Sequence, residues 1–264
     1  MLKIDRIVKV FNPGTVNEKT ALSGLSLHLS DGDFCTVIGG NGAGKSTMLN
    51  AVAGVFSVDA GTISIDGEDV TRLSEHKRAR YIGRVFQDPM TGTAATMQIE
   101  ENLALARRRG QRRTLRVGIT RAEREEYREL LKLLDLGLED RLTSKVGLLS
   151  GGQRQALTLL MASLVRPKLL LLDEHTAALD PKTAAKVLEA TDKIVNRDHL
   201  TTLMVTHNMR DAIRYGNRLI MMNDGKIILD IAGEEKQRLT VENLMTAFFK
   251  ASGEEFANDR ALLS

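Results

Sequence analysis

The feature that most constrains this chain is a glycine-rich segment between an apolar run and a second apolar pattern of helical period. The apolar run is Phe34–Gly39, and the segment is Gly39-Gly40-Asn41-Gly42-Ala43-Gly44-Lys45-Ser46. Two glycines that flank four residues, followed by Lys and Ser, match the phosphate-binding P-loop. Glycines let consecutive backbone N–H groups curl around phosphate oxygens, and the following helix adds its positive N-terminal end. The segment predicts a strand, a phosphate-binding loop and a helix, in that order.

Each part of this loop has an expected task. Lys45 is expected to reach the β- and γ-phosphates of a nucleotide, and Ser46 is expected to bind Mg²⁺. A dinucleotide-binding loop is excluded, because Lys45 stands where that fingerprint needs a glycine. The nucleotide-binding residues expected here are Gly39, Gly40, Asn41, Gly42, Ala43, Gly44, Lys45, Ser46 and Thr47.

Two carboxylates follow an unbroken apolar run late in the chain. Leu169–Leu172 is expected to form a strand buried on both faces, with Asp173 and Glu174 at its C-terminal end, where α/β sheets place ligand sites. Asp173 would hold the Mg²⁺ shell, and Glu174 would polarise the attacking water. The alternative is a surface pair that caps the helix beginning near Pro181. A P-loop in the same chain favours the metal site.

The order of the expected elements indicates an α/β fold. Strands are expected at Leu2–Phe11, Ala21–Leu29, Phe34–Gly39, Gly61–Asp66, Leu169–Asp173, Thr201–Thr206, Arg218–Met222 and Lys226–Asp230. Helices are expected at Lys45–Val55 and Pro181–Asn196, and from Met97 to about Leu138 the pattern is helical and charged. This alternation predicts a mostly parallel sheet covered by helices, with a helical subdomain inserted into it.

Bulk properties exclude several classes of protein. No apolar run approaches the roughly 18 residues needed to span a bilayer, and the N-terminus lacks the apolar core of a signal peptide. The one cysteine, Cys35, lies in an apolar run; it permits no internal disulfide and suits a reducing compartment. The net charge of +3 is small, and no nucleic-acid partner is expected.

A short segment before a helical pattern indicates the family. Leu149-Ser150-Gly151-Gly152-Gln153, taken with the P-loop and the carboxylate strand, resembles the ATPase domain of ABC transporters over essentially the whole chain. The resemblance implies that Ser150, Gly151, Gly152 and Gln153 contact the γ-phosphate held by the P-loop of a second subunit. It therefore implies a head-to-tail pair of subunits with two ATP molecules between them.

The same resemblance assigns further site residues. Gln87 matches the glutamine that senses Mg²⁺ and the attacking water while contacting the transmembrane partner, and His207 matches the histidine that contacts the γ-phosphate. Asp180 ends the loop Ala178-Leu179-Asp180, which links the two sites. Phe11 matches the aromatic residue that stacks on adenine, although a core Phe at a strand end is the alternative. The expected catalytic residues are Glu174, Lys45, His207 and Gln87, and the expected metal ligands are Ser46, Gln87 and Asp173.

Two features depart from the family pattern. His175 stands where many relatives have a proline, and it either changes only local backbone stiffness or places a titrating imidazole near the attacking water. The segment between Leu105 and Thr120 is unusually basic, and it is either a solvated loop or a contact for anionic headgroups or the permease. Its arginines are Arg107, Arg108, Arg109, Arg112, Arg113 and Arg116.

The resemblance predicts one domain over residues 1–264: a P-loop NTPase core at 1–87 and 160–264, with an antiparallel β subdomain and an inserted α-helical subdomain at about 88–159. The predicted function is that of an ATP-binding and ATP-hydrolysing subunit, which energises transport of a small solute, an amino acid being one candidate. The expected partners are a second copy, transmembrane permease subunits and a separate solute-binding protein, at the cytoplasmic face of the membrane.

Two rival functions are weighed. An exporter ATPase is one, and a compact chain without its own membrane segments favours an importer over it. A non-transport ABC ATPase in translation or DNA maintenance is the other. Translation factors of this superfamily usually carry two such domains, and DNA-repair members insert a long coiled coil before the signature. Only a short segment separates Gln87 from Ser150 here, which favours a transporter subunit.

Overall fold

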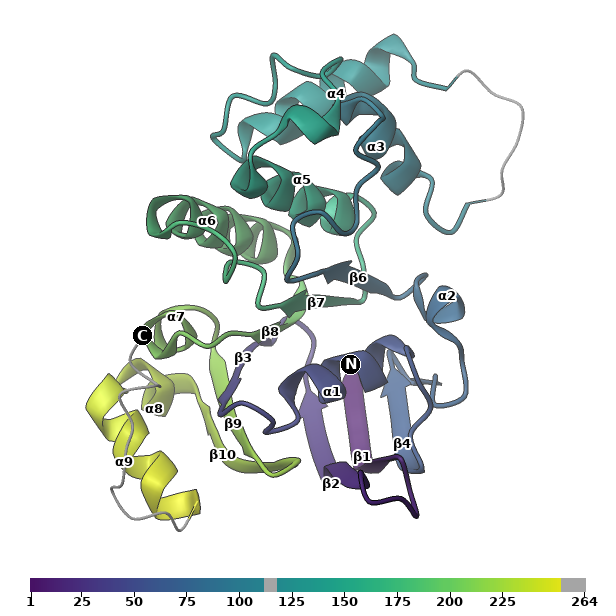
Figure 1. The fold of residues 1–264 in the computed structure, drawn as a ribbon. Coiled ribbons are helices and arrows are strands. Elements are labelled where there is room, and N and C mark those ends of the chain that lie inside the picture. Colours follow the sequence, from purple (N-terminus) through teal and green to yellow (C-terminus); the bar gives the residue numbers. More distant parts are fainter. Residues whose placement is uncertain (112–117, 253–264) are drawn as a thin grey trace. The chain divides into compact units, whose positions relative to one another are not determined.

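The computed structural model describes residues 1–111 and 118–252, and the chain divides into two compact units (Figure 1). The first unit is discontinuous and consists of Met1–Tyr81 and Thr201–Ser264, and the second is Ile82–Leu200. The expected division into a core and an insertion at about residues 88–159 stays a prediction. No helix in the described ranges is long and apolar enough to cross a membrane.

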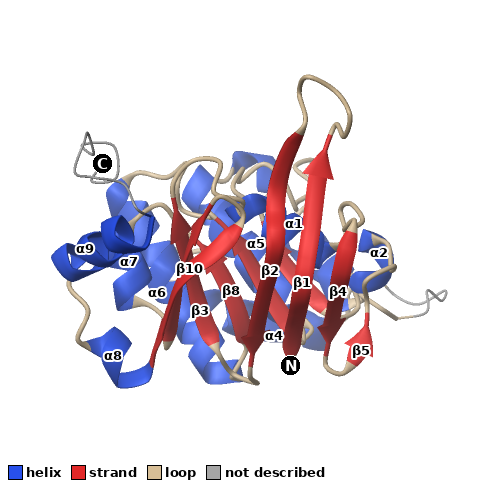
Figure 2. Ribbon diagram, turned by 90° about the horizontal axis from the view of Figure 1, so that it is seen from below, coloured by secondary structure: helices blue, strands red, loops and turns tan. Residues whose placement is uncertain are grey.

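The first unit contains an antiparallel sheet with strand order β2-β1-β4-β5. Its strands are β1 (Leu2–Phe11), β2 (Lys19–Leu29), β4 (Ala60–Ile65) and β5 (Glu68–Asp69). In Figure 2, β2, β1 and β4 run side by side. Buried Leu2 and Ile4 alternate with exposed Lys3, the period-two pattern of a sheet with one face in a core. The antiparallel β subdomain expected from the resemblance is therefore present.

The same unit contains a second set of strands, in the order β10-β9-β3-β8. These are β3 (Phe34–Gly39), β8 (Thr201–Val205), β9 (Arg218–Asn223) and β10 (Lys226–Ala232). Strand β3 pairs in parallel with both β8 and β9, and β10 is antiparallel to β9. Helix α1 (Lys45–Ala53) follows β3. The short helix α2 (Glu75–Arg78) comes just before Tyr81, where the first stretch of this unit ends. The mixed, mainly parallel pattern agrees with the predicted α/β class.

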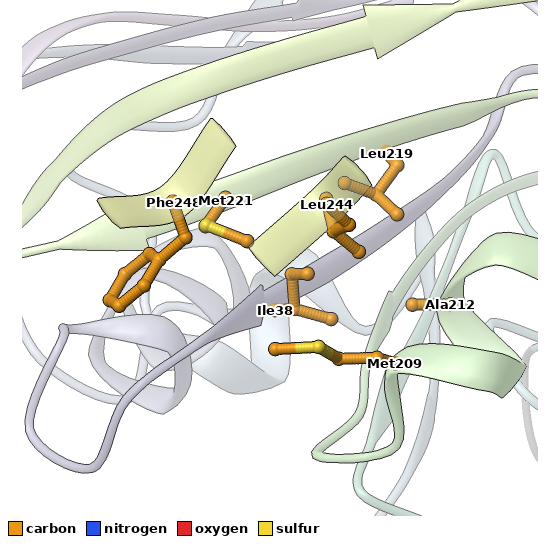
Figure 3. Packing of buried hydrophobic residues seen from close by; sticks show 7 residues of the cluster. All are labelled: Ile38, Met209, Ala212, Leu219, Met221, Leu244 and Phe248. Carbon is orange, nitrogen blue, oxygen red and sulfur yellow. The ribbon is translucent and has the colours of Figure 1, made fainter. Parts of the chain in front are cut away.

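Three helices after β8 complete the first unit. They are α7 (Met209–Arg214), α8 (Gly233–Gln237) and α9 (Val241–Ser252), none of which the sequence patterns indicated. Leu244 and Phe248, one helical turn apart on α9, pack into a cluster with residues of β3, β9 and α7 (Figure 3). The cluster consists of Ile38, Met209, Ala212, Leu219, Met221, Leu244 and Phe248.

The second unit packs helices around two parallel strands, β6 (Ile82–Val85) and β7 (Leu169–Asp173). Its helices are α3 (Ile99–Arg107), α4 (Arg121–Lys132), α5 (Gly151–Leu164) and α6 (Pro181–Asp198), with a 3₁₀ turn at Val146–Leu148. Helix α5 approaches β6 so closely that a Cβ on Gly83 would lie 2.5 Å from the carbonyl oxygen of Ala162. Only glycine fits this contact between strand and helix.

The first arginines of the basic segment are engaged within the second unit. Arg107 donates to Glu126 at 2.6 Å, and Arg108 donates to the carbonyl of Gly118. The half-buried guanidinium of Arg109 donates to Ala162 O at 3.1 Å and to Val165 O, which satisfies carbonyls at the end of α5. Arg109 therefore fastens the end of α5, while Arg107 and Arg108 form ion pairs with Glu126 and Glu123 at the surface. Arg112, Arg113 and Arg116 lie outside the described residues.

Lys236 is a buried cation near the C-terminal end of α7. Its side chain is 2% exposed, and Nζ donates to the carbonyls of Tyr215 and Gly216. Burial penalises the charged form and lowers the pKa of Lys236 from 10.5 to about 8. Cys35, also fully buried, has its pKa raised to about 12 by the same effect, as expected for a cysteine inside a strand.

We expect Lys236 to make folding stability depend on alkaline pH. Between pH 8 and 10.5 the unfolded chain binds more protons at this residue than the folded chain, so the free energy of unfolding rises with pH in that interval. Lys236→Met has no titrating group at this position, so its free energy of unfolding should lack this rise. Urea unfolding across that interval should show the wild type gaining stability relative to Lys236→Met. The exposed Lys3→Met variant is the control, and a constant difference between wild type and Lys236→Met would contradict the expectation.

Candidate functional site

The phosphate loop joins β3 to α1, and at two of its glycines a side chain would collide with the backbone. Gly39 has φ 152°, and a Cβ there would overlap the carbonyl oxygen of Met222. Gly44 has φ 98°, and a Cβ there would lie 2.7 Å from the carbonyl oxygen of Ala21. These two glycines are therefore required by backbone packing as well as by the predicted approach of a phosphate.

The interior of the loop has the features of an anion site. Lys45 is 5% exposed, and its Nζ donates to Gly39 O at 2.6 Å and Gly40 O at 3.1 Å. A Cβ on Gly40 would meet nothing within 4 Å, and the N-cap residue of α1 is Gly44, which has no side chain to cap the helix. The N-terminal end of a helix beside an ammonium suits a phosphate. The predicted loop residues Asn41, Gly42 and Ser46 are exposed, Ala43 is buried and Thr47 is half-buried.

His207 lies at the same sheet edge as this loop. Strands β3 and β8 are parallel, Val37 is opposite Val205, and the N–H of Thr206 donates to Val37 O at 3.1 Å. The exposed His207 follows directly. Because parallel strands end at a common edge, the first unit brings together the P-loop and the predicted γ-phosphate histidine.

Phe11 ends β1 and is half-buried beside a second aromatic ring. Its ring meets that of Phe56 edge to face, with centroids 5.4 Å apart, and Lys9 Nζ lies 5.6 Å from its centroid. Lys9 is held in turn by Asp59 at 2.9 Å. Both interpretations of Phe11 thus have a basis: it packs against its neighbours without being fully enclosed.

In the second unit, the two carboxylates take up different environments at the end of β7. The side chain of Asp173 is 14% exposed, with Oδ2 3.7 Å from Nη2 of Arg84. Glu174 is 8% exposed and has φ 45°, a left-handed conformation that costs a non-glycine residue about 1–3 kcal/mol. Such strain is common at functional sites, but the role of Glu174 stays a prediction.

The alternative reading of these carboxylates as helix caps is wrong. Helix α6 is capped by Asp180, whose Oδ1 accepts from the N–H of Thr183 at 3.1 Å. Hydrogen bonds from the side chain and the backbone of Thr183 lower the pKa of the Asp180 carboxyl. Its predicted nucleotide contact stays a prediction.

The signature segment forms the start of α5. Ser150 and Gln153 make a reciprocal capping box: the Ser150 hydroxyl accepts from the N–H of Gln153 at 3.3 Å, and Gln153 Oε1 accepts from the N–H of Ser150 at 3.1 Å. A Cβ on the buried Gly152 would overlap the methyl of Thr183 on α6. Gly151 is exposed, and a Cβ there would make only ordinary contacts, the closest at 3.5 Å. Packing against α6 therefore requires glycine at position 152, whereas position 151 has room for a side chain.

Two residues missed in the sequence tie α5 to the segment that carries Gln87. Arg154, 3% exposed, donates to Met90 O at 3.1 Å and to Thr93 Oγ1 at 2.6 Å. Gln155, 0% exposed, donates to Phe86 O at 2.7 Å. Gln87 itself is exposed, between these two anchors. Arg154-Gln155, two long polar residues near the N-terminus of a mostly apolar helical pattern, was the signal in the sequence that could have indicated this role.

His175 is buried against α6. Its Nε2 lies 3.1 Å from Thr191 Oγ1, and because that hydroxyl donates to Val187 O, it accepts from the imidazole N–H. Burial lowers the pKa of His175 to about 4, so the ring is neutral near pH 7. Packing, rather than titration in that range, accounts for this residue.

Comparisons with known proteins agree with this arrangement. A family model described as ABC transporter matches residues 22–177. A tyrosine transport ATP-binding protein of Clostridioides difficile is 46% identical over 248 residues, covering 94% of this chain and 98% of that protein. The methionine import ATP-binding protein MetN of Bartonella henselae is 33% identical over 86% of this chain and 64% of its own length. A dimeric ATP-binding cassette in a post-hydrolysis state, bound to ADP and Pi, is similar with a TM-score of 0.75 at 29% identity, over 88% of this chain and 98% of that one.

We expect the two signature glycines to respond differently to alanine. Gly152→Ala should lower the free energy of unfolding by about 1–3 kcal/mol, because the new methyl collides with Thr183 in a packed helix contact. Gly151→Ala should leave the stability equal or slightly higher, because alanine favours the helix and the space is open. Thermal and urea unfolding measure both. Equal loss in the two variants would contradict the steric assignment.

Proposed function

Because the chain belongs to the ABC transporter family, as one of its ATP-binding ATPase subunits, we propose that it powers import of an amino-acid-type solute through a separate permease. Two relatives are named for tyrosine transport and methionine import, which supports this solute class and this direction. The proposal places the chain at the cytoplasmic face of the membrane, with a solute-binding protein on the other side. These names favour an importer over the exporter and non-transport alternatives.

The observation that carries the proposal is the glycine-rich phosphate loop between β3 and α1. Its backbone is fixed by contacts at Gly39 and Gly44, so it does not need to be ordered when a nucleotide binds. Lys45 is already held inside the loop by the carbonyls of Gly39 and Gly40. We assign to Lys45 the binding of β- and γ-phosphate oxygens, which are stronger acceptors than those carbonyls.

The proposed metal ligands fit Mg²⁺ by their chemistry. Ser46, Asp173 and Gln87 offer a hydroxyl, a carboxylate and an amide oxygen, and Mg²⁺ prefers oxygen donors. Nη2 of Arg84 lies 3.7 Å from Oδ2 of Asp173, so its positive charge balances that of the carboxylate. When bound, Mg²⁺ would neutralise charge on the phosphates.

Glu174 is proposed to orient the attacking water. Glu174 is 8% exposed, whereas the Asp173 carboxylate lies 3.7 Å from Arg84, and we assign the two carboxylates separate tasks. Lys45 and His207 would stabilise charge on the transferring phosphoryl group, and Gln87 would report on the water.

The proposal also assigns the signature to the nucleotide of a partner subunit. Ser150, Gly151 and Gly152 lie at the N-terminus of α5, where helix N–H groups and the dipole favour an anion. A dimeric relative bound to ADP and Pi supports a paired arrangement. In a symmetric head-to-tail pair, each site takes its P-loop from one subunit and its signature from the other. Asp180 would link the two sites.

We expect Glu174→Gln to bind ATP but to lose about two orders of magnitude or more in turnover, since the water loses its general base. The variant should also accumulate as an ATP-bound dimer in size-exclusion chromatography. In cells, uptake of labelled amino acids should fall with it. Wild-type turnover would contradict the role of Glu174, and unchanged uptake of every amino acid would contradict the solute class.

We expect Lys45→Ala and Ser150→Arg subunits to complement each other. Each homodimer has both sites broken, but in a mixed dimer both lesions fall on one site and the other site is intact. Mixing two nearly inactive preparations should therefore restore hydrolysis, measured as phosphate release after tagged co-purification of the mixed dimer.

Crosslinking separates the possible failures of that experiment. Ser46→Cys and Ser150→Cys provide the thiols, and the native Cys35 does not interfere because it is buried, with a pKa of about 12. ATP-dependent crosslinks between subunits, with no recovered hydrolysis, would mean that the two sites must act together. Crosslinks only within one subunit would refute the shared site.

A further inference from the structure

We propose that Lys19 is an additional nucleotide-binding residue, whose ammonium contacts the phosphates held by the P-loop. The proposal rests on the proposed function, because it needs ATP in that loop. Neither the P-loop pattern nor the resemblance to the family assigned Lys19 a role. It begins β2, directly across the ladder from Phe11.

The backbone directs Lys19 toward the loop. The pairing of β2 with β1 is shifted here: Lys9 lies opposite Leu22 and Val10 opposite Thr20, so Ala21, two places after Lys19, is an extra residue in β2. Ala21 is buried at the loop: its carbonyl oxygen is the atom that excludes a Cβ at Gly44, and it likewise excludes one at Gly225. Phe11 lies opposite Lys19 in the register, so these two side chains share one face of the hairpin. The end of the hairpin that carries Phe11 and Lys19 is thus next to the segment of β2 that contacts the P-loop.

The side chain of Lys19 reaches the loop itself. A Cβ built on Gly42, where φ is 82°, would lie 3.4 Å from Lys19 Nζ. Lys19 is exposed, and within residues 1–111 and 118–252 its ammonium has no hydrogen bond or ion pair. Lys45 differs in both respects, since it is buried and bonded to carbonyls of the loop. Lys19 therefore supplies a second positive charge at the outer side of the same loop.

The chemistry selects phosphate as the contact. A nucleotide that stacks on Phe11 and places its phosphates in the P-loop must pass the residue that lies between them. Lys19 is that residue, because it is paired with Phe11 and its Nζ lies 3.4 Å from the place that a Cβ on Gly42 would take. Of the groups along this path, only the phosphates carry charge, and an ammonium gains most from a charged acceptor.

The test compares Lys19→Met with two matched variants of the whole chain. Lys19→Arg keeps the charge, and Lys3→Met removes another exposed lysine from the same antiparallel sheet. Kd is measured by calorimetry or competition for MgATP and for magnesium tripolyphosphate, which has no base or ribose. Lys19→Met should weaken both ligands about five- to tenfold, as expected for a lost charge-assisted hydrogen bond. Lys19→Arg and Lys3→Met should bind like the wild type, and unfolding curves check that all variants are folded.

Each outcome has one meaning. If Lys45→Ala loses ATP affinity while Lys19→Met binds both ligands like the wild type, the role of Lys19 is overturned and the proposed function stands. If Lys19→Met weakens ATP but not tripolyphosphate, the contact is to base or ribose and the phosphate assignment is wrong. If Lys45→Ala binds ATP like the wild type, the proposed nucleotide site itself fails.

Discussion

Direct contact between backbone segments at three glycines holds the phosphate loop in place. Gly39 lies against Met222 O, while Gly44 and Gly225 lie against Ala21 O. Hydrogen bonds from Gly225 N–H to Ala43 O and from Ser23 N–H to Gly225 O, each 3.0 Å, complete the junction. Three parts of the chain thus meet without intervening side chains: the loop, the start of β2 and the β9–β10 turn. The positions of Phe11 and Lys19 depend on this junction, because Lys19 begins β2 and Phe11 is paired with it from β1.

Helix α5 has the corresponding role in the second unit. Its first residues form the capping box of the signature, and Gly152 sets its distance from α6. Arg154 and Gln155 hold the segment on either side of Gln87. At its other end, Ala162 O excludes a side chain from Gly83 and accepts from Arg109. One helix therefore joins the signature, the Gln87 segment and β6, and these elements cannot shift independently without breaking its contacts.

Local patterns predicted much of this arrangement. The bounds of β1, β3 and β7 agree with the sequence prediction, because an alternating polar and apolar pattern (β1) and apolar runs that end in glycine or a charge (β3 and β7) are local signals. The α/β class and the family are confirmed. Features that depend on distant contacts were not predictable: the collision that reserves position 152 for glycine, the capping of α5 by Arg109, and the burial of His175 under Thr191. Helices α7 and α9 were missed because their apolar residues pack against β3 and β9, which are other parts of the chain. The roles of the predicted site residues stay predictions, since they concern ligands and a second subunit.

The discontinuity of the first unit has a consequence for the order in which the chain acquires structure during synthesis. Strand β3, which presents the phosphate loop, has β8 and β9 as its parallel neighbours, and its Ile38 packs against α9. All three are made after the second unit, Ile82–Leu200, which is continuous in sequence. On the ribosome, the second unit can therefore complete its own contacts while the apolar faces of β3 still lack theirs. The P-loop is synthesised among the first fifty residues, yet it is among the last parts to be enclosed.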